Sequence, residues 1–239
     1  MSMSLTVAGL QKMTLLDFPG HVACTVFLQG CNFRCPFCHN SDLLPGSGEI
    51  FMTAEEFLDF LKKRTGLLDA VCVSGGEPTL QKELPDFLRQ IKALGYKVKL
   101  DTNGFRPEVL KGLATEGLVD YVAMDVKNSP AAYGETVGVA KLDLSRIEES
   151  LRFLIGGTVP YELRTTVVSE LHNEQTMEEM GQWLSALVPG KKPAKLFLQS
   201  FVNRDSVLRS GLSSPTDEQL QKYVFILTPY IDVVTVRGT

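Results

Sequence analysis

The sequence contains no long uninterrupted hydrophobic run, since no stretch approaches the 18 consecutive apolar residues of a membrane-spanning helix. It does not begin with a charged segment followed by an apolar one, so no secretory signal is expected. Basic blocks are also absent: 24 Lys and Arg stand against 28 Asp and Glu, a net charge of −4. We therefore expect a cytoplasmic protein that binds neither membrane nor nucleic acid.

Cysteine is scarce and unevenly placed. Of five cysteines, Cys31, Cys35 and Cys38 fall within eight residues, whereas Cys24 and Cys72 stand alone in predicted strands. An odd, clustered set does not suggest a disulfide framework. We interpret Cys24 and Cys72 as small buried apolar residues and the other three as ligands of a metal centre.

The chain does contain a regular alternation of short apolar runs with amphipathic stretches of helical period. The runs predict strands at 22–29, 70–74, 97–101, 121–125, 162–168 and 195–199, and the amphipathic stretches predict helices at 53–64, 83–94, 107–115, 144–155, 174–187 and 216–227. Such an alternation predicts a parallel sheet with right-handed crossovers. About six units fall short of an eightfold barrel. The predicted fold is α/β, a partial (β/α)6 TIM-like open barrel of one domain over residues 1–239, with a lead-in over 1–20 and a last apolar run, 231–236, that could close the sheet.

Residues with reactive or charged side chains follow the predicted strands. In chain order these are the three cysteines, Gly75-Gly76-Glu77-Pro78, Asp101-Thr102-Asn103-Gly104, Asp125 with Lys127, and Arg164 inside the fifth strand. The carboxyl ends of parallel strands share one face, where active sites of such proteins lie. The sequence therefore predicts that these residues belong to one site.

The cysteine segment reads Cys31-Asn-Phe-Arg-Cys35-Pro-Phe-Cys38-His39. Iron–sulfur clusters are held by thiolates, and three thiolates on a four-iron cluster leave one iron open to another ligand, as in catalytic metal sites. A zinc site with His39 is an alternative. A Cys35–Cys38 redox pair would leave Cys31 unexplained, and the c-type haem pattern would require export.

The spacing of three residues and then two, with Phe37 before the last cysteine, resembles the signature of the radical S-adenosylmethionine (SAM) superfamily. The segments Leu16-Asp-Phe-Pro-Gly20, Thr25-Val-Phe-Leu-Gln-Gly30 and Cys38-His39-Asn40 resemble the activating enzymes of glycyl radical enzymes. Within that family, the activators of anaerobic ribonucleoside-triphosphate reductases are the most similar, and those of pyruvate formate-lyase are similar over most of the chain. The resemblance extends from about residue 10 to the C-terminus.

The resemblance implies the cofactors. In this family SAM binds the open iron of a [4Fe–4S] cluster, and one electron from the cluster cleaves SAM to methionine and a 5′-deoxyadenosyl radical. It also implies cofactor-binding roles for the sequence positions that match the family's motifs. Gly75, Gly76, Glu77 and Pro78 would receive the SAM amino group; Asp101, Thr102 and Asp125 would hold a monovalent cation; Lys127 and Arg164 would contact SAM; Asn103 suits a ribose or a cation, and Phe37 offers an apolar face.

Simpler interpretations remain beside these roles. The glycine-rich segment could be an ordinary strand-to-helix turn, and Asp125 and Lys127 could form only a surface ion pair, which contributes about 0–1 kcal/mol. The implied activity is abstraction of a glycine Cα hydrogen from a glycyl radical enzyme, with reduced flavodoxin or ferredoxin as the electron donor. The alternatives are a radical SAM enzyme acting on a small molecule such as a deazapurine precursor, and a non-enzymatic zinc or iron–sulfur protein.

Overall fold

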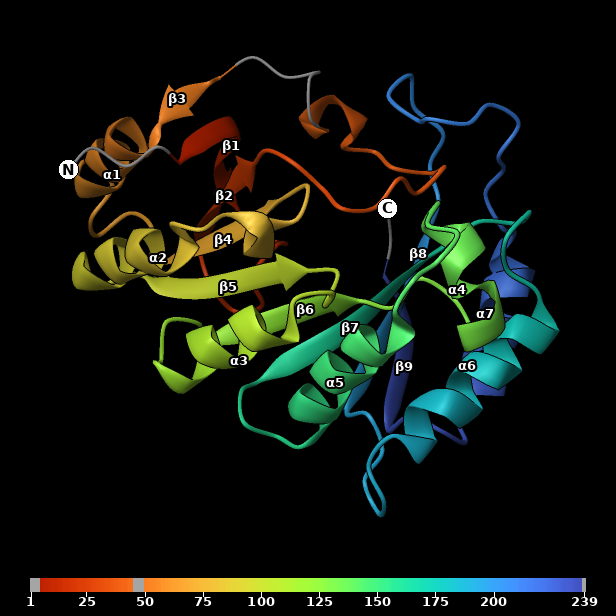
Figure 1. Cartoon of the computed structure of the whole chain (residues 1–239). Helices are drawn as coiled ribbons and strands as arrows, with labels where there is room; N and C mark the ends of the chain where they lie inside the picture. Colours follow the sequence, from red (N-terminus) through yellow and green to blue (C-terminus); the bar gives the residue numbers. More distant parts are fainter. Residues whose placement is uncertain (1–4, 45–49, 238–239) are drawn as a thin grey trace. The chain divides into compact units, whose positions relative to one another are not determined.

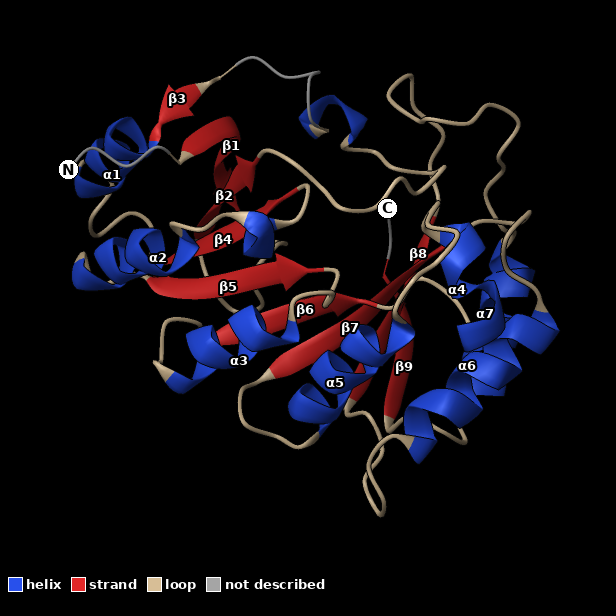
Figure 2. Ribbon diagram, in the orientation of Figure 1, coloured by secondary structure: helices blue, strands red, loops and turns tan. Residues whose placement is uncertain are grey.

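The structure, a computed structural model, describes residues 5–44 and 50–237. Strands and helices alternate along most of the chain (Figures 1 and 2). The strands are β1 (Thr6–Thr14), β2 (Ala23–Leu28), β3 (Met52–Thr53), β4 (Ala70–Gly75), β5 (Lys97–Thr102), β6 (Tyr121–Asp125), β7 (Tyr161–Val167), β8 (Lys195–Ser200) and β9 (Val233–Arg237). The α-helices are α1 (Ala54–Lys62), α2 (Leu84–Ala93), α3 (Pro107–Thr115), α4 (Pro130–Thr136), α5 (Leu144–Ile155), α6 (Glu174–Ala186) and α7 (Asp217–Leu227), and the 3₁₀ turns are η1 (Ser41–Leu43) and η2 (Pro78–Leu80).

The described chain forms two compact units. The first contains residues 5–32, 40–44, 50–102 and 108–123. Its strands follow the order β3-β1-β2-β4-β5. β1 runs antiparallel to β2 and β3, whereas β2, β4 and β5 are mutually parallel. The apolar stripes of α1 and α2 supply fully buried residues such as Phe57 and Phe87. Helix α1 begins with a capping box, in which Thr53 and Glu56 exchange hydrogen bonds.

The second unit contains residues 33–39, 103–107 and 124–237. Its strands β7, β8 and β9 are parallel neighbours. Helices α5 and α6 bury Leu151, Leu154, Met180 and Leu184 in this unit. A two-pronged ion pair joins the outer strands, since both Arg237 guanidinium Nη atoms lie 2.9 Å from the carboxylate oxygens of the fully buried Glu162.

The predicted α/β class with an open sheet is confirmed. The strand order is β3-β1-β2-β4-β5-β6-β7-β8-β9, and in the described residues the end strands β3 and β9 do not pair with each other. The run predicted to close the sheet forms β9, which instead lies parallel beside β8. At the other end of the order, β1 and β3 add antiparallel strands.

Besides the two-residue strand β3 and the two 3₁₀ turns, a strand and a helix were not predicted from sequence. The lead-in over 1–20, of which residues 1–4 lie outside the described part, contains the nine-residue strand β1. Its partly exposed residues do not alternate in polarity, so period-two patterning was absent. The short helix α4 follows Ser129, where Pro130 fits a first helical turn but seven residues carry too little periodicity. The single-domain assignment stays a prediction.

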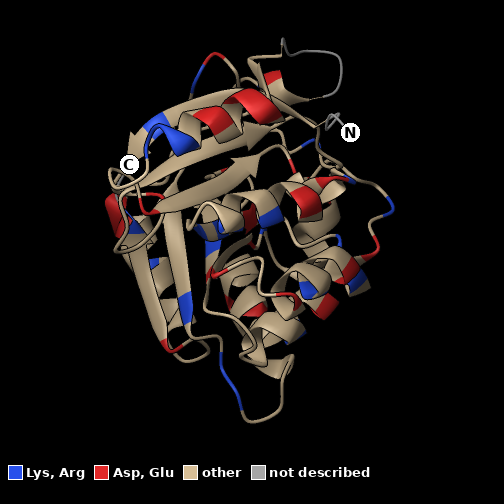
Figure 3. Ribbon diagram, turned by 90° about the vertical axis from the view of Figure 1, so that its left-hand side faces the viewer, with Lys and Arg blue, Asp and Glu red and all other residues tan. Residues whose placement is uncertain are grey.

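Charged residues of both signs are interspersed along the helices drawn in Figure 3. Some form pairs one helical turn apart, such as Lys62 with Asp59 and Arg89 with Asp86. Across the residues that the structure describes, no helix is both long and apolar enough to cross a membrane.

Candidate functional site

The glycine-rich segment after β4 packs against the first residues of the cysteine loop. The backbone N–H of Gly76 donates to the Leu28 carbonyl at 3.0 Å, and that of Glu77 donates to the Gly30 carbonyl at 2.7 Å. A Cβ atom at Gly76 would overlap the Gly30 carbonyl oxygen and come 3.3 Å from the Cys31 Cβ. The glycines are therefore required by the approach of the chain to its own cysteine loop, a reason that the sequence did not reveal.

Glu77 turns into the protein. Its side chain is 1% exposed, and Oε1 accepts hydrogen bonds from the Thr79 hydroxyl at 2.5 Å and the Thr102 hydroxyl at 2.8 Å. The carboxylate thus links the turn at Pro78, the first residue of η2, to the end of β5. This gives Glu77 and Thr102 a structural role, and the contacts of Glu77 with SAM and of Thr102 with a monovalent cation stay predictions.

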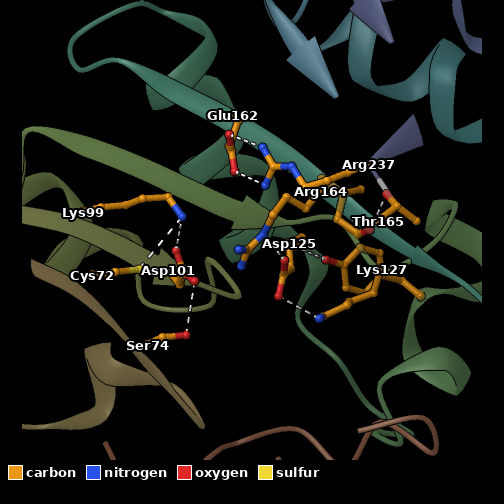
Figure 4. A network of polar contacts seen from close by, with 12 residues as sticks. Cys72, Ser74, Lys99, Asp101, Asp125, Lys127, Glu162, Arg164, Thr165 and Arg237 are labelled. Atoms are coloured by element: carbon orange, nitrogen blue, oxygen red, sulfur yellow. Dashed lines mark hydrogen bonds and ion pairs between the residues drawn. The ribbon is translucent and has the colours of Figure 1, made fainter. Parts of the chain in front are cut away.

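Each carboxylate oxygen of Asp101 accepts a hydrogen bond from a neighbouring side chain. The Lys99 ammonium lies 2.8 Å from Oδ1, and the Ser74 hydroxyl donates to Oδ2 at 3.2 Å (Figure 4). Lys99 is 1% exposed and its Nζ lies 4.0 Å from the Cys72 Sγ. Lys99 was missed from sequence, although a lysine two residues before an aspartate in an apolar strand places both on one face.

The second part of the cysteine loop is held by main-chain hydrogen bonds within its own unit. The N–H of Arg34 donates to the Val137 carbonyl at 2.9 Å, and the N–H of Arg209 donates to the Pro36 carbonyl at 3.0 Å. Inside the loop the N–H of Cys38 donates to the Cys35 carbonyl at 3.1 Å. These contacts fix the backbone from which Cys35 and Cys38 project.

His39 anchors the end of the loop. Its Nε2 donates to the Val202 carbonyl at 2.6 Å, and the Ser206 hydroxyl donates to the His39 carbonyl at 2.9 Å. The ring stacks on Phe201 with the centroids 5.5 Å apart. Burial lowers the pKa of His39, and the hydrogen bond to Val202 only partly offsets this. The residue therefore acts as a neutral anchor of the loop.

Asp125 holds two basic side chains. Its Oδ2 lies 2.9 Å from the Lys127 ammonium, and its Oδ1 accepts from Arg164 Nε at 3.0 Å (Figure 4). Lys127 also lies 5.9 Å from the ring centroid of the buried Phe37. Burial alone would lower the pKa of Lys127, but the negative charges of Asp125 and Cys35 outweigh it and raise the pKa. With Lys127 and Arg164 only 14% and 15% exposed, this is not a loose surface pair.

His172, to which no role was assigned from sequence, contacts the main chain of Lys127. Its Nδ1 accepts from the Val168 N–H at 3.1 Å, and its Nε2 donates to the Lys127 carbonyl at 2.9 Å. Burial lowers the pKa of His172, so the imidazole is neutral. In sequence, Val168 lies 4 residues and Lys127 lies 45 residues from His172. The bond to Lys127 therefore could not be predicted without the fold.

Asn103 closes a turn at the end of β5. Its side-chain oxygen accepts from the Phe105 N–H at 3.0 Å, and the Ser150 hydroxyl donates to the Gly104 carbonyl at 2.6 Å. Gly104 has φ of +75°, a conformation that favours glycine. The ribose or cation contact of Asn103 stays a prediction.

The five cysteines are free thiols, and the predicted burial of Cys24 and Cys72 is confirmed. Cys24 and Cys72 are fully buried, whereas Cys31 and Cys38 are half-buried and Cys35 is at the border of burial. Burial raises the pKa of Cys24 to about 12, which keeps that thiol protonated. Among the described side chains, no three His, Cys, Asp or Glu lie in an arrangement suited to one metal ion.

The donor set suits an iron–sulfur cluster. Three thiols lie on one eight-residue loop whose backbone is tied down before Cys31 and on both sides of Cys35. Thiolates are the ligands of such clusters, and the Lys127 ammonium is near enough to Cys35 to interact with it electrostatically. The residues expected to hold a monovalent cation fit less well, because Asp101 and Asp125 already pair with lysine or arginine.

An open α/β sheet with a three-cysteine loop directly after β2 defines a class of protein, and comparisons with known proteins define it further. The Radical SAM superfamily matches residues 25–185. A Methanocaldococcus jannaschii protein assigned as a glycyl-radical enzyme activating enzyme is 33% identical over 98% of this chain and 97% of its own length. The pyruvate formate-lyase-activating enzyme of Clostridium pasteurianum is 36% identical over 51% of this chain and 52% of its own.

A solved structure has the same fold. Streptococcus suis SuiB bound to SAM superposes with a TM-score of 0.66 at 14% identity, over 87% of this chain and 48% of SuiB. The chain thus spans about half the length of that protein. This chain belongs to the radical SAM superfamily. It is an enzyme of the radical SAM oxidoreductase type, and the family implies a [4Fe–4S] cluster and SAM as its cofactors.

Proposed function

We propose that this enzyme is an activase that abstracts a hydrogen atom from the Cα of a glycine in a partner protein. The similarity over nearly the full length of a protein assigned as a glycyl-radical enzyme activating enzyme carries this proposal. We further propose an anaerobic ribonucleotide reductase as the partner and reduced flavodoxin or ferredoxin as the electron donor. The cytoplasmic location stays a prediction.

In this proposal Cys31, Cys35 and Cys38 hold the cluster. When bound, the cluster and SAM supply the electron and the radical for hydrogen abstraction. The protein contributes position and shielding. The turn at Gly75 and Gly76 packs against the residues that precede the first cysteine. Hydrogen bonds to the backbone of Arg34 and Pro36 hold the rest of the loop.

The charged residues of the second unit orient the cofactor. The SAM carboxylate is an anion, and Lys127 and Arg164 present two cations fixed by one carboxylate. Charge-assisted hydrogen bonds of this kind are about twice as strong as neutral ones. His172 holds the Lys127 main chain, which makes it a positioning residue. A monovalent cation is not part of the proposal, because Asp101 and Asp125 already have side-chain counter-charges.

The test is the formation of a glycyl radical. The anaerobically reconstituted and reduced enzyme is mixed with SAM and an anaerobic ribonucleotide reductase, and an electron paramagnetic resonance doublet is expected on the reductase. The doublet should become a singlet when the reductase carries glycine deuterated at Cα. Cys38→Ala should abolish the signal, whereas Cys24→Ala should retain it. Turnover of a small molecule without any partner, and no radical on the reductase, would contradict the proposal.

A further inference from the structure

Lys99 is a charged residue in a place where an apolar one would serve the fold. It lies in β5 opposite Cys72 of β4, with 1% of its side chain exposed. An ammonium removed from water is unfavourable unless an anion and hydrogen bonds compensate it. Asp101 supplies that anion, with its Oδ1 2.8 Å from the Lys99 Nζ.

The parallel pairing of β4 and β5 brings this group together. Residues two apart in a strand share a face, so Lys99 and Asp101 lie side by side, and so do Cys72 and Ser74 on β4. Figure 4 shows the Lys99 ammonium and the Ser74 hydroxyl reaching Asp101. Each oxygen of this carboxylate is therefore bonded to a side chain of the same sheet.

A role in the candidate site explains the buried Lys99–Asp101 ion pair better than a contribution to folding stability does. Replacing a buried ion pair with apolar residues of similar volume is often neutral or stabilising, so a strand of this kind has little need of the pair. Asp101 is 13% exposed and Lys99 only 1%. The carboxylate is thus at the more accessible end, and the lysine approaches it from the interior.

We infer that Lys99 is a positioning residue that acts as a built-in cation at Asp101. Its ammonium carries the single positive charge that an alkali metal ion would bring, and its stem holds that charge in the sheet. The enzyme consequently needs no monovalent metal ion at Asp101. The charge of Asp125 is balanced in the same way, by the side chains of Lys127 and Arg164. The inference rests on the proposed binding of SAM at this site, but its test involves no turnover.

The first experiment compares the thermal unfolding of the reconstituted full chain in potassium, sodium or choline chloride at equal ionic strength. It uses the wild type and Asp101→Asn. We expect the same response to the three salts in both proteins, because no alkali ion binds Asp101. A stabilisation of the wild type by potassium or sodium that is lost in Asp101→Asn would overturn the inference.

The second experiment removes the built-in cation. Lys99→Met keeps the apolar stem and leaves Asp101 without its ammonium. We expect potassium or sodium to raise the unfolding midpoint of this variant by about 3 °C over choline, and we expect the response to vanish in Lys99→Met/Asp101→Asn. A variant that responds to the salts as the wild type does would overturn the inference.

Two further variants serve as controls. Lys92→Met, which breaks the half-exposed pair of Lys92 with Asp120, should gain no alkali response. Lys99→Arg keeps the charge and should stay insensitive to the choice of salt. If Lys99→Met does not fold, the comparison of the wild type with Asp101→Asn decides by itself. Because none of these measurements involves a partner protein, a failed activation assay leaves this result unaffected.

Discussion

At the scale of single residues, the charged groups of the site are organised by their counter-charges. Asp125 touches both Lys127 and Arg164, so one carboxylate sets the direction of two basic side chains. The raised pKa of Lys127 keeps it cationic at neutral pH. The pair therefore offers a constant positive charge to an anionic group of a cofactor.

Asp125→Asn should weaken SAM binding about tenfold, because the amide leaves Lys127 and Arg164 without the charge that orients them. Equilibrium binding of SAM to the reconstituted protein measures this, with iron content as a check on the cluster. Asp120→Asn, which disturbs the Lys92 pair, is the matched control and should leave SAM affinity unchanged. Equal affinities of wild type and Asp125→Asn would contradict the assignment.

The burial of His172 should make the stability of the protein depend on pH. Burial lowers its pKa below the ordinary 6.5, so the unfolded chain takes up a proton before the folded one does. Stability should be fully present above pH 6.5 and should fall as pH decreases below that value. His172→Gln should flatten the slope of unfolding free energy between pH 7.5 and 5.5. Some slope should remain, because His39 has a lowered pKa too; an unchanged slope would show that His172 does not titrate this way.

At the scale of elements, the turn after β4 and the loop after β2 form one packed unit. The parallel register places Leu28 opposite Gly75, and the chain beyond each strand stays in contact through the bonds to Leu28 and Gly30. Asn40 adds a side-chain hydrogen bond to the Gly75 carbonyl at 3.0 Å. The shape of the cysteine loop therefore depends on residues that are not cysteines.

Gly76→Ala should destabilise the protein by about 3 kcal/mol, because its Cβ would overlap the Gly30 carbonyl. Chemical denaturation of the full chain measures this, and iron uptake on reconstitution should fall as well. Gly112→Ala is the matched control: it lies exposed in α3 with open space around it and should be neutral or stabilising by about 0.5–1 kcal/mol. Similar stabilities of the two variants would disprove the packing argument.

At the scale of the whole molecule, cluster binding should stabilise the fold. A ligand that binds the folded chain and not the unfolded one raises the unfolding midpoint, and metal sites made of cysteines behave in this way. The reconstituted protein should contain about four iron and four sulfide per chain. Removing the cluster with a chelator should lower the midpoint.

Cys35→Ala should lose the iron and sulfide and show no further change on treatment with chelator. Cys24→Ala, which alters a buried thiol outside the loop, should retain both the cluster and the chelator effect. Stoichiometric zinc without sulfide in anaerobically prepared wild type would instead support the zinc interpretation.

The sequence by itself determined the features that depend on neighbours along the chain. The order of most strands and helices and the cysteine spacing follow from patterns within about a dozen residues, and they were sufficient to indicate the radical SAM superfamily. The weakly patterned strand β1 and the short helix α4 were missed because a pattern that short or irregular carries no period.

Only the tertiary structure decided which partner each polar side chain meets. Glu77 turns inward to Thr102, Lys99 neutralises Asp101 beside Cys72, and His172 reaches the Lys127 carbonyl. Cys72 and Lys99 meet across 27 residues, and Lys127 and His172 across 45. A shift of one residue in the pairing of β4 and β5 would turn Lys99 and Asp101 away from Cys72 and Ser74, because alternate residues of a strand face opposite sides. Strand register is set by packing of the whole sheet, so these contacts could not be derived from the local sequence.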